Sequence, residues 1–320
     1  GTRYEHRNLI GYLDGLKSFE HDALERFYKK WYRPDYQAIV IVGDLDAEAT
    51  EARLKSLMAD IPAPAADAAQ KEVIVVPDNE EPIVSIYTDP EMQGSRVQLF
   101  IKRPAMPTQM NDKVAWEVVN VIESFLTTME NARLQEIAMQ PDAPFLGAGM
   151  GSGDVIGIIP TLNATAFTAM TQDGKLAEGF EALYTEMEKI RRHGFTQSEF
   201  ERAQENLMRQ VERTYANRND RTNEQFVNIY LENYRKNEPM PDAETEWKLD
   251  SMLIKMLNVE TVNAFAKETI QPTNQVIVIT APEKEGIANP TEEEILAIRD
   301  KVAASEVTAY EDHGVKEPLI

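Results

Sequence analysis

Histidine has the widest capacity for metal binding and acid–base catalysis, and the chain has four, His6, His21, His193 and His313. None of them belongs to a His-x-x-His, His-x-x-x-His or His-x-x-Glu-His pattern. A mononuclear zinc site usually takes two ligands from one helix face and a third from elsewhere, so the sequence predicts no zinc ligand among them. We expect His21 in a first helical turn and His193 at a helix end, where it complements the helix dipole.

The other residue types that support catalysis form no recognisable set either. The chain contains no cysteine, which excludes disulfides, thiol catalysis and cysteine-ligated metal. No Ser/His/Asp combination can be nominated, and the carboxylates are too numerous to single out a pair. Three arginines lie among acidic residues in a stretch expected to be helical, and such a stretch is typically a solvated face whose charges pair with one another: Arg213, Arg218 and Arg221 with Glu212, Asp220 and Glu224.

Four glycines alternate along one stretch, at Gly147, Gly149, Gly151 and Gly153. A phosphate-binding loop needs its glycines in a strand-to-helix turn, often with a lysine, whereas here the spacing is two, strands are expected to follow, and no lysine is adjacent. Alternating glycines in a strand instead permit close approach of another backbone or mark bulges. A plain structural use is the first interpretation. The alternative is an edge against which an extended peptide or a facing domain lies.

The charge balance limits the kinds of partner. The chain has 320 residues with 33 Lys+Arg against 54 Asp+Glu, a formal net charge of -21. Nucleic acids and anionic membrane surfaces both require a cationic footprint, so neither is an expected partner. Basic peptides or cations remain compatible, but an acidic solvated surface is the simpler explanation. No run approaches the roughly 20 apolar residues of a membrane span.

One supersecondary unit occurs twice. The segments 27–43 and 265–281 both predict the last turns of a helix, a turn with proline and a buried strand. The two segments align at one constant offset, which pairs Phe27 with Phe265, Pro34 with Pro272, and Ile39-Val40-Ile41 with Ile277-Val278-Ile279. Such duplication predicts two similar domains that each end in the same element. Because little precedes the first copy, we expect the chain to begin inside a domain and to be a piece of a longer protein.

The composition suggests where the domains divide. Residues 62–70, Pro-Ala-Pro-Ala-Ala-Asp-Ala-Ala-Gln, have the character of a linker. We therefore expect residues 1–62 to be the C-terminal tail of one domain, 63–70 a linker, 71–305 a second domain, and 306–320 a further linker.

Hydrophobic periodicity and turn residues predict the individual elements. Strands are expected at 38–42, 72–76, 83–87, 97–101, 145–153, 155–159, 161–170 and 275–280. Helices are expected to begin near 20, 46, 111 (capped by Asn111), 129, 176, 196, 244, 259 and 291, with a break near 217–220. Capping boxes are expected at Thr196/Glu199 and Thr291/Glu294, and Gly194 should end a helix. The pattern predicts an α+β fold with a mixed, largely antiparallel sheet and helices layered on one face, preceded by the tail of a similar domain.

At the repeated unit the sequence resembles the pitrilysin family of inverted-zincin metallopeptidases, which includes insulin-degrading enzyme and mitochondrial processing peptidase. The segments 31–34, 38–42 and 43–46 resemble the family's "Y-x-P … vvvGDvd" segment. Residues 7–11 resemble "R-x-P-I-G", with Leu9 in place of the proline. Three further segments resemble later family motifs in the same order: 129–134 ("l-x-x-R-L"), 143–145, and 194–203 ("G-x-T-x-x-E-l-x-x-A").

The resemblance implies a fold like that of LuxS and mitochondrial processing peptidase, in which four α+β domains form two halves around a closed chamber. In the family the zinc site lies early in the first domain, where two histidines of His-x-x-Glu-His and a distant glutamate bind zinc and the motif glutamate activates water. This sequence lacks the motif. No catalytic, cofactor-binding or metal-binding residue can be transferred to it.

The function that the resemblance implies is the non-catalytic part of a zinc-dependent endopeptidase, inactive alone, which forms chamber wall and positions the zinc domain. The parent would hold zinc and cleave peptides, with neighbouring domains of the same chain as partners. Bacterial relatives are often periplasmic, so the family implies the periplasm. A scaffold or partner subunit of the same fold without peptidase activity is the alternative, and an unrelated α+β binding module is a third hypothesis.

Overall fold

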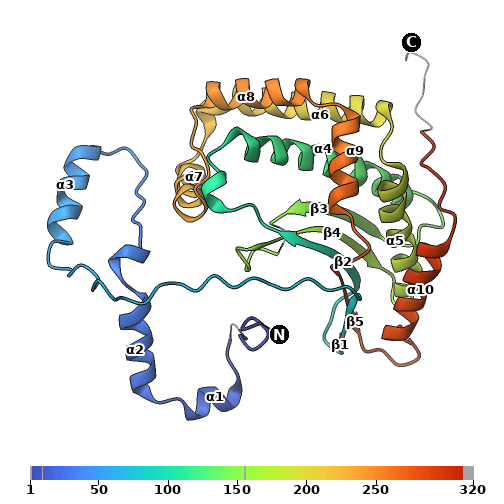
Figure 1. The fold of residues 1–320 in the computed structure, drawn as a ribbon, viewed down its shortest axis with the longest axis horizontal. Coiled ribbons are helices and arrows are strands. Elements are labelled where there is room, and N and C mark those ends of the chain that lie inside the picture. Colours follow the sequence, from blue (N-terminus) through green and yellow to red (C-terminus); the bar gives the residue numbers. More distant parts are fainter. Residues whose placement is uncertain (1, 9, 155, 313–320) are drawn as a thin grey trace. The chain divides into compact units, whose positions relative to one another are not determined.

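The computed structural model describes residues 2–8, 10–154 and 156–312 (Figure 1). The chain divides into two compact units. The larger contains residues 77–216 and 241–320, and the smaller contains residues 1–76 and 217–240.

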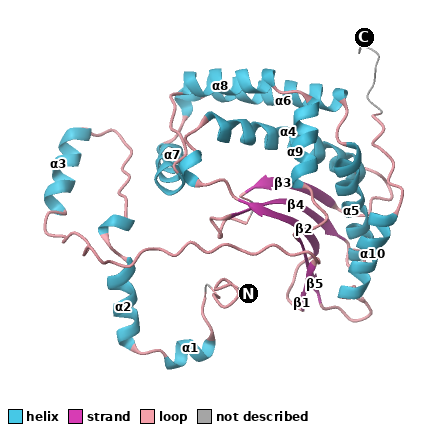
Figure 2. Cartoon of the chain, viewed as in Figure 1, coloured by secondary structure: helices cyan, strands magenta, loops and turns pink. Residues whose placement is uncertain are grey.

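The larger unit is built on one five-stranded sheet of order β1-β5-β2-β4-β3 (Figure 2). Its strands are β1 (Ile83–Asp89), β2 (Ser95–Pro104), β3 (Gly147–Gly153), β4 (Leu162–Thr171) and β5 (Gln275–Pro282). Only the β1–β5 pair is parallel, and β5–β2, β2–β4 and β4–β3 are antiparallel. The predicted mixed, largely antiparallel sheet is therefore confirmed.

Helices cover one face of this sheet in two layers (Figure 2). The helices α4 (Val114–Ala138) and α5 (Leu176–His193) contact the strands directly, and α9 (Val259–Thr269) packs against both. The helices α6 (Gln197–Ala216) and α8 (Ala243–Met256) lie over α4, and α10 (Glu292–Ala304) lies against α5.

The core lies between the sheet and these helices because alternate strand residues are apolar and face them. Leu99 of β2 pairs with Phe167 on β4 and with Ile277 on β5, and all three are fully buried. From the helix side, Phe125 of α4 stacks on Phe200 of α6 with the ring centroids 4.6 Å apart. The predicted helices on one face are confirmed.

Several local predictions are confirmed where the signal is a cap or a glycine. The capping boxes at Thr196/Glu199 and Thr291/Glu294 both form. The helix α5 ends at Gly194, whose φ is 70°. The charged stretch from 196 is interrupted after Ala216, as expected, by a 3-10 turn at Arg218–Asp220.

Other local predictions were wrong. The chain forms one helix of 25 residues at Val114–Ala138 where two were expected, because no glycine or proline interrupts it. Asn111 does not cap that helix; the N-cap position is Lys113. The expected strands at 72–76 and 156–159 do not form, and Val73, Val75 and Ile158 are 76%, 70% and 63% exposed without a neighbouring strand to pair with. Val155 lies outside the described residues.

The smaller unit contains α1 (Leu13–Ser18), α2 (His21–Trp31), a 3-10 turn at Pro34–Tyr36, α3 (Ala47–Leu57) and α7 (Asn223–Lys236). Asp46 caps α3 as expected. Tyr36 connects the 3-10 turn to residues 69–71, because its hydroxyl donates to the Ala69 carbonyl at 3.3 Å and accepts the Lys71 N–H at 3.0 Å. The strand expected at 38–42 does not form, because the smaller unit has no strand among its described residues with which this segment could pair.

Candidate functional site

The histidines named by the sequence are scattered through the chain. His6 is exposed, His21 is the exposed first residue of α2, and His313 lies outside the described residues. His193 ends α5, and its Nε2 lies 2.7 Å from the Val307 carbonyl oxygen. Because a carbonyl can only accept, this nitrogen carries the hydrogen. Among the residues with described positions, no group of three or more His, Cys, Asp or Glu could hold a metal ion.

The alternating glycines lie on β3, one of the two edge strands of the sheet. The side chain of Asn131 on α4 holds this edge: its Nδ2 donates to the Met150 carbonyl at 3.1 Å, and its Oδ1 accepts the Met150 N–H at 2.7 Å. A Cβ on Gly149 would lie 3.5 Å from that Oδ1, and one on Gly153 would lie 2.9 Å from Oε2 of Glu123. Gly149 and Gly153 thus admit side chains of α4 close to the strand, whereas a Cβ on Gly147 would meet nothing within 4 Å. At Met150 the backbone N–H and carbonyl are already bonded to Asn131.

A second polar anchor joins α4 to the sheet. The Arg103 guanidinium on β2 pairs with the Glu123 carboxylate on α4 and donates to the Ser152 hydroxyl on β3 at 3.1 Å. The side chains of Arg103 and Glu123 are only 17% and 12% exposed. Ion pairs that are this well buried and hydrogen-bonded fix geometry more than they add stability.

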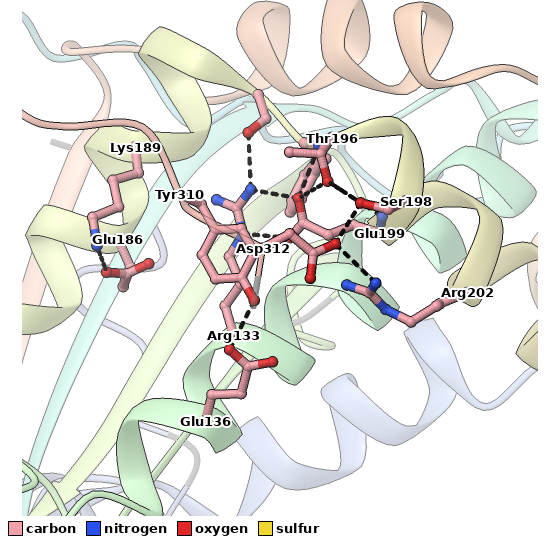
Figure 3. A network of polar contacts seen from close by, with 12 residues as sticks. Arg133, Glu136, Glu186, Lys189, Thr196, Ser198, Glu199, Arg202, Tyr310 and Asp312 are labelled. Atoms are coloured by element: carbon pink, nitrogen blue, oxygen red, sulfur yellow. Dashed lines mark hydrogen bonds and ion pairs between the residues drawn. The ribbon is translucent and has the colours of Figure 1, made fainter. Parts of the chain in front are cut away.

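The most elaborate arrangement of charges in the described chain centres on Arg133 of α4 (Figure 3). This side chain is 1% exposed, and it makes a bidentate pair with Glu199 of α6, with Nε–Oε1 at 2.6 Å and an Nη2–Oε2 distance of 2.9 Å. It also donates to the Gly194 carbonyl at 3.0 Å. Charge-assisted bidentate hydrogen bonds are the strongest that these groups form.

Aromatic rings enclose the same guanidinium. Its carbon lies 4.6 Å from the centre of the Phe195 ring and 4.4 Å from that of Tyr310. Burial opposes the charged form of Arg133, but the hydrogen bonds and charge of Glu199 outweigh it and raise the pKa of the guanidinium above its ordinary value. Glu199 also accepts from the Thr196 N–H at 2.8 Å, so one carboxylate caps α6 and neutralises Arg133.

The segment after α10 is bound to this network (Figure 3). The Tyr310 hydroxyl donates to Glu136 Oε2 at 2.8 Å, and Asp312 accepts from Ser198 and, at 2.9 Å, from Arg202. Burial, and then the Glu136 carboxylate, raise the pKa of the Tyr310 phenol. Val307 is 7% exposed. Residues 305–312 therefore lie on the helical layer, where polar and aromatic contacts hold them to α4, α5 and α6.

Glu130 lies one helical turn from Arg133 but plays a different part. It is fully buried, and neither of its oxygens has a hydrogen-bond partner in the described part of the chain. Burial and the nearby Glu186 carboxylate raise its pKa well above the ordinary value. An unpaired buried carboxylate is costly, so Glu130 is held as the neutral acid.

Replacing Glu130 with Gln should stabilise the chain at neutral pH. In the unfolded chain this carboxyl ionises near pH 4.3, while the folded chain keeps the proton, so its contribution to stability is lost as the pH rises above the unfolded value. The neutral amide removes that penalty. In urea unfolding, we expect the free energy of unfolding of Glu130→Gln to exceed that of the unsubstituted chain by roughly 1–2 kcal/mol at about pH 8 and by less at about pH 5.5. The exposed Glu268→Gln is the control, and an equal gain at both pH values would contradict the assignment.

The sequence alone did not reveal this network. Arg133 and Glu199 lie within two of the motifs that carry the family resemblance, but 66 residues separate them and no local pattern says that they meet. The capping box predicted the bond of Glu199 to its own helix and not the second bond to Arg133. Tyr310 and Asp312 were assigned to a linker, where no contact was expected.

The larger unit is thus an α+β domain, in which helices cover one face of the sheet and buried ion pairs connect the elements. The chain belongs to the Peptidase M16 inactive domain family, which it matches over residues 18–207. This confirms the predicted pitrilysin-type resemblance.

Two similar curated proteins are named as zinc proteases. The chain is 22% identical over 261 residues to "Probable zinc protease PqqL" of Escherichia coli (strain K12), which covers 82% of this chain and 27% of the relative. It is 20% identical over 324 residues to "Zinc protease PQQL-like" of Arabidopsis thaliana, which covers 100% of the chain and 30% of the relative. The chain therefore spans less than a third of the length of these relatives.

Solved structures agree on the fold. The first half of the periplasmic protease PqqL from Escherichia coli superposes with a TM-score of 0.80 at 20% identity, over 97% of this chain and 65% of that one. A peptidase M16 inactive domain from Pseudomonas fluorescens gives 0.58 at 17% identity, over 88% and 61% of the two chains. The predicted α+β architecture is thus that of known M16 inactive domains.

Proposed function

We propose that this chain is the non-catalytic part of a zinc-dependent endopeptidase whose peptide-bond hydrolysis takes place in another domain of the same parent protein. The observation that carries the proposal is the match to the M16 inactive domain over residues 18–207. The names of the curated relatives, which are zinc proteases, support the activity of the parent. The parent would bind the zinc, and this chain would bind none.

The proposal includes a division of the chain. Residues 1–62 would be the tail of a preceding, zinc-bearing domain, 63–70 a linker, 71–305 the inactive domain, and 306–320 a connection toward the following half. The described part of that connection, up to Asp312, lies on the helical layer. Such attachment would let the inactive domain fix the direction in which the chain continues.

In this arrangement the inactive domain contributes chamber wall and positions the zinc domain, and the substrate is a peptide enclosed by the assembly. The periplasm is the proposed location, since one similar structure is that of a periplasmic protease. No described helix has the length and apolar character needed to cross a membrane.

The test is peptide hydrolysis by the full-length parent and by the 320-residue chain, with the glutamate of the upstream His-x-x-Glu-His changed to Gln as control. We expect cleavage by the parent alone, and its loss in the control. A parent without that motif and without cleavage would contradict the proposal and would support the alternative, a scaffold or partner subunit of the same fold. Cleavage by the 320-residue chain would contradict both.

A further inference from the structure

The segment that follows α10, residues 305–312, is attached to the helices in the way that a bound peptide is. No backbone-to-backbone hydrogen bond holds residues 306–311 within the described part of the chain, and these residues form no helix or strand. The segment touches the helices through Val307, which is buried, and through Tyr310 and Asp312, which are half-buried, while the residues between these three are exposed. We call residues 305–312 the strap.

Side chains of α4, α5 and α6 form the surface on which the strap lies. We call this surface the seat, and its members are Arg133, Glu136, Arg192, His193, Ser198 and Arg202. Two of them bind the backbone of the strap: Arg192 donates to the Ser305 carbonyl, and His193 donates to the Val307 carbonyl, both at 2.7 Å. These contacts depend on the extended shape of the strap and not on its side chains.

Two of the seat arginines are held in place without the strap. Arg133 is fixed by its bidentate pair with Glu199 and by the Gly194 carbonyl. Arg192 pairs with the buried Glu188, with Nε–Oε2 at 2.6 Å. A site whose groups are already ordered loses little free energy when a ligand binds, so this part of the seat is prepared for a peptide.

The seat matches a tyrosine at one position of the strap (Figure 3). The Tyr310 ring lies against the Arg133 guanidinium, with 4.4 Å between the guanidinium carbon and the ring centre, which is a cation–π contact. The Tyr310 hydroxyl donates to Glu136 Oε2 at 2.8 Å. A phenylalanine could make the first contact but not the second.

The seat also matches a carboxylate two residues further on (Figure 3). Asp312 accepts from the Ser198 hydroxyl and from Arg202 Nη1, the latter at 2.9 Å. Together with the buried Val307, these contacts define a pattern: an extended segment with an apolar residue at position i, a tyrosine at i+3 and a carboxylate at i+5.

We propose that the seat is a peptide-binding site for extended acidic segments of this pattern, and that the strap is its built-in, exchangeable occupant. Release of the strap leaves the helices beneath it joined, by the Arg133–Glu199 pair and by the stacked rings of Phe125 and Phe200. The seat then binds a matching segment of another polypeptide. Because the tethered strap is seated, its dissociation constant as a free peptide lies below its effective concentration, on the order of 1 mM. The inference does not depend on the proposed peptidase function.

Peptide binding to the 320-residue chain tests the proposal. The triple variant Val307→Ser/Tyr310→Ala/Asp312→Ala releases the strap and changes no residue of the seat. The probe is a fluorescently labelled peptide with the sequence of residues 305–312, Ser-Glu-Val-Thr-Ala-Tyr-Glu-Asp, followed by fluorescence anisotropy. We expect the triple variant to bind it with a Kd of about 1 mM or lower, and at least tenfold more tightly than the unsubstituted chain, whose own strap competes. Equal binding to both chains, or no binding to the variant at about 1 mM, would overturn the proposal.

A single variant keeps the test valid if the triple variant loses its cooperative thermal unfolding transition. Tyr310→Ala leaves Val307 in the core and should still raise the affinity for the peptide at least threefold over that of the unsubstituted chain. No gain in affinity would overturn the proposal.

Two controls separate recognition of the pattern from attraction between charges. A scrambled peptide of the same composition should bind the triple variant at least tenfold more weakly. Adding Arg202→Met to the triple variant should weaken binding of the original peptide at least threefold, because it removes the partner of the carboxylate. Arg209→Met, at a 65% exposed position of the same helix outside the seat, should leave binding unchanged. Equal affinity for the scrambled peptide, or equal effects of the two arginine changes, would overturn the proposal.

Discussion

Replacing Arg133 with Met is expected to lower the free energy of unfolding by about 3–5 kcal/mol, because it leaves the carboxylate of Glu199 buried without its counter-charge. Glu199 is 5% exposed, so water cannot replace the guanidinium. The Gly194 carbonyl and the rings of Phe195 and Tyr310 lose their partner at the same time. Urea unfolding followed by far-ultraviolet circular dichroism measures the change.

The control for this variant is Arg202→Met, which removes a cation from the same network at a solvent-facing position. Arg202 is 50% exposed and pairs with Asp312, so its loss should cost no more than about 1 kcal/mol. The double variant Arg133→Met/Glu199→Gln should recover part of the loss, since it also removes the buried charge. Equal costs for the two arginine variants would show that the buried pair has no special role.

Gly194→Ala is expected to destabilise the chain by about 2–4 kcal/mol, because two independent penalties meet at one position. Gly194 has φ 70° and ψ -156°, a conformation open almost only to glycine. A Cβ there would lie 2.5 Å from Cγ of Asn263. Asn263 cannot move freely, because its side chain accepts from the Phe195 N–H at 2.8 Å and donates to the Phe195 carbonyl at 3.0 Å.

Gly286→Ala separates the two penalties. Gly286 also has a positive φ, 79°, but a Cβ there would meet nothing within 4 Å. Its substitution should cost only the backbone strain, about 1–2 kcal/mol. Thermal unfolding should therefore show the larger fall in midpoint for Gly194→Ala, and identical midpoints would contradict the close packing between Gly194 and Asn263.

The sequence predicted the elements whose determinants are local. The helix α9 has the predicted bounds because Asn258 caps it and apolar residues recur at helical spacing. The strand β5 was predicted from an unbroken β-branched run. A similar run at 38–42 led to the same prediction, but no strand forms there. A strand is completed by its neighbours, and a pattern within one segment carries no information on whether the neighbours are present.

The polar network shows the same limit for sites. The bond between Glu199 and its own helix is a three-residue pattern and was predicted, whereas its pairing with Arg133 depends on how α4 and α6 cross. The contact between Asn131 and β3 was not predicted, because nothing in the local sequence distinguishes an exposed asparagine from one that bonds the backbone of an edge strand. The alternating glycines could be interpreted from the sequence as positions of close approach. The sequence did not predict that α4 is the element that approaches them.

Metal content is the most direct test of the proposed function, in which the zinc centre lies in another domain of the parent protein and not in this chain. Elemental analysis should find about one tightly bound zinc per full-length parent. The 320-residue chain, purified in parallel, should contain no stoichiometric zinc after exhaustive dialysis. One zinc retained per 320-residue chain, or none in the active parent, would contradict the account.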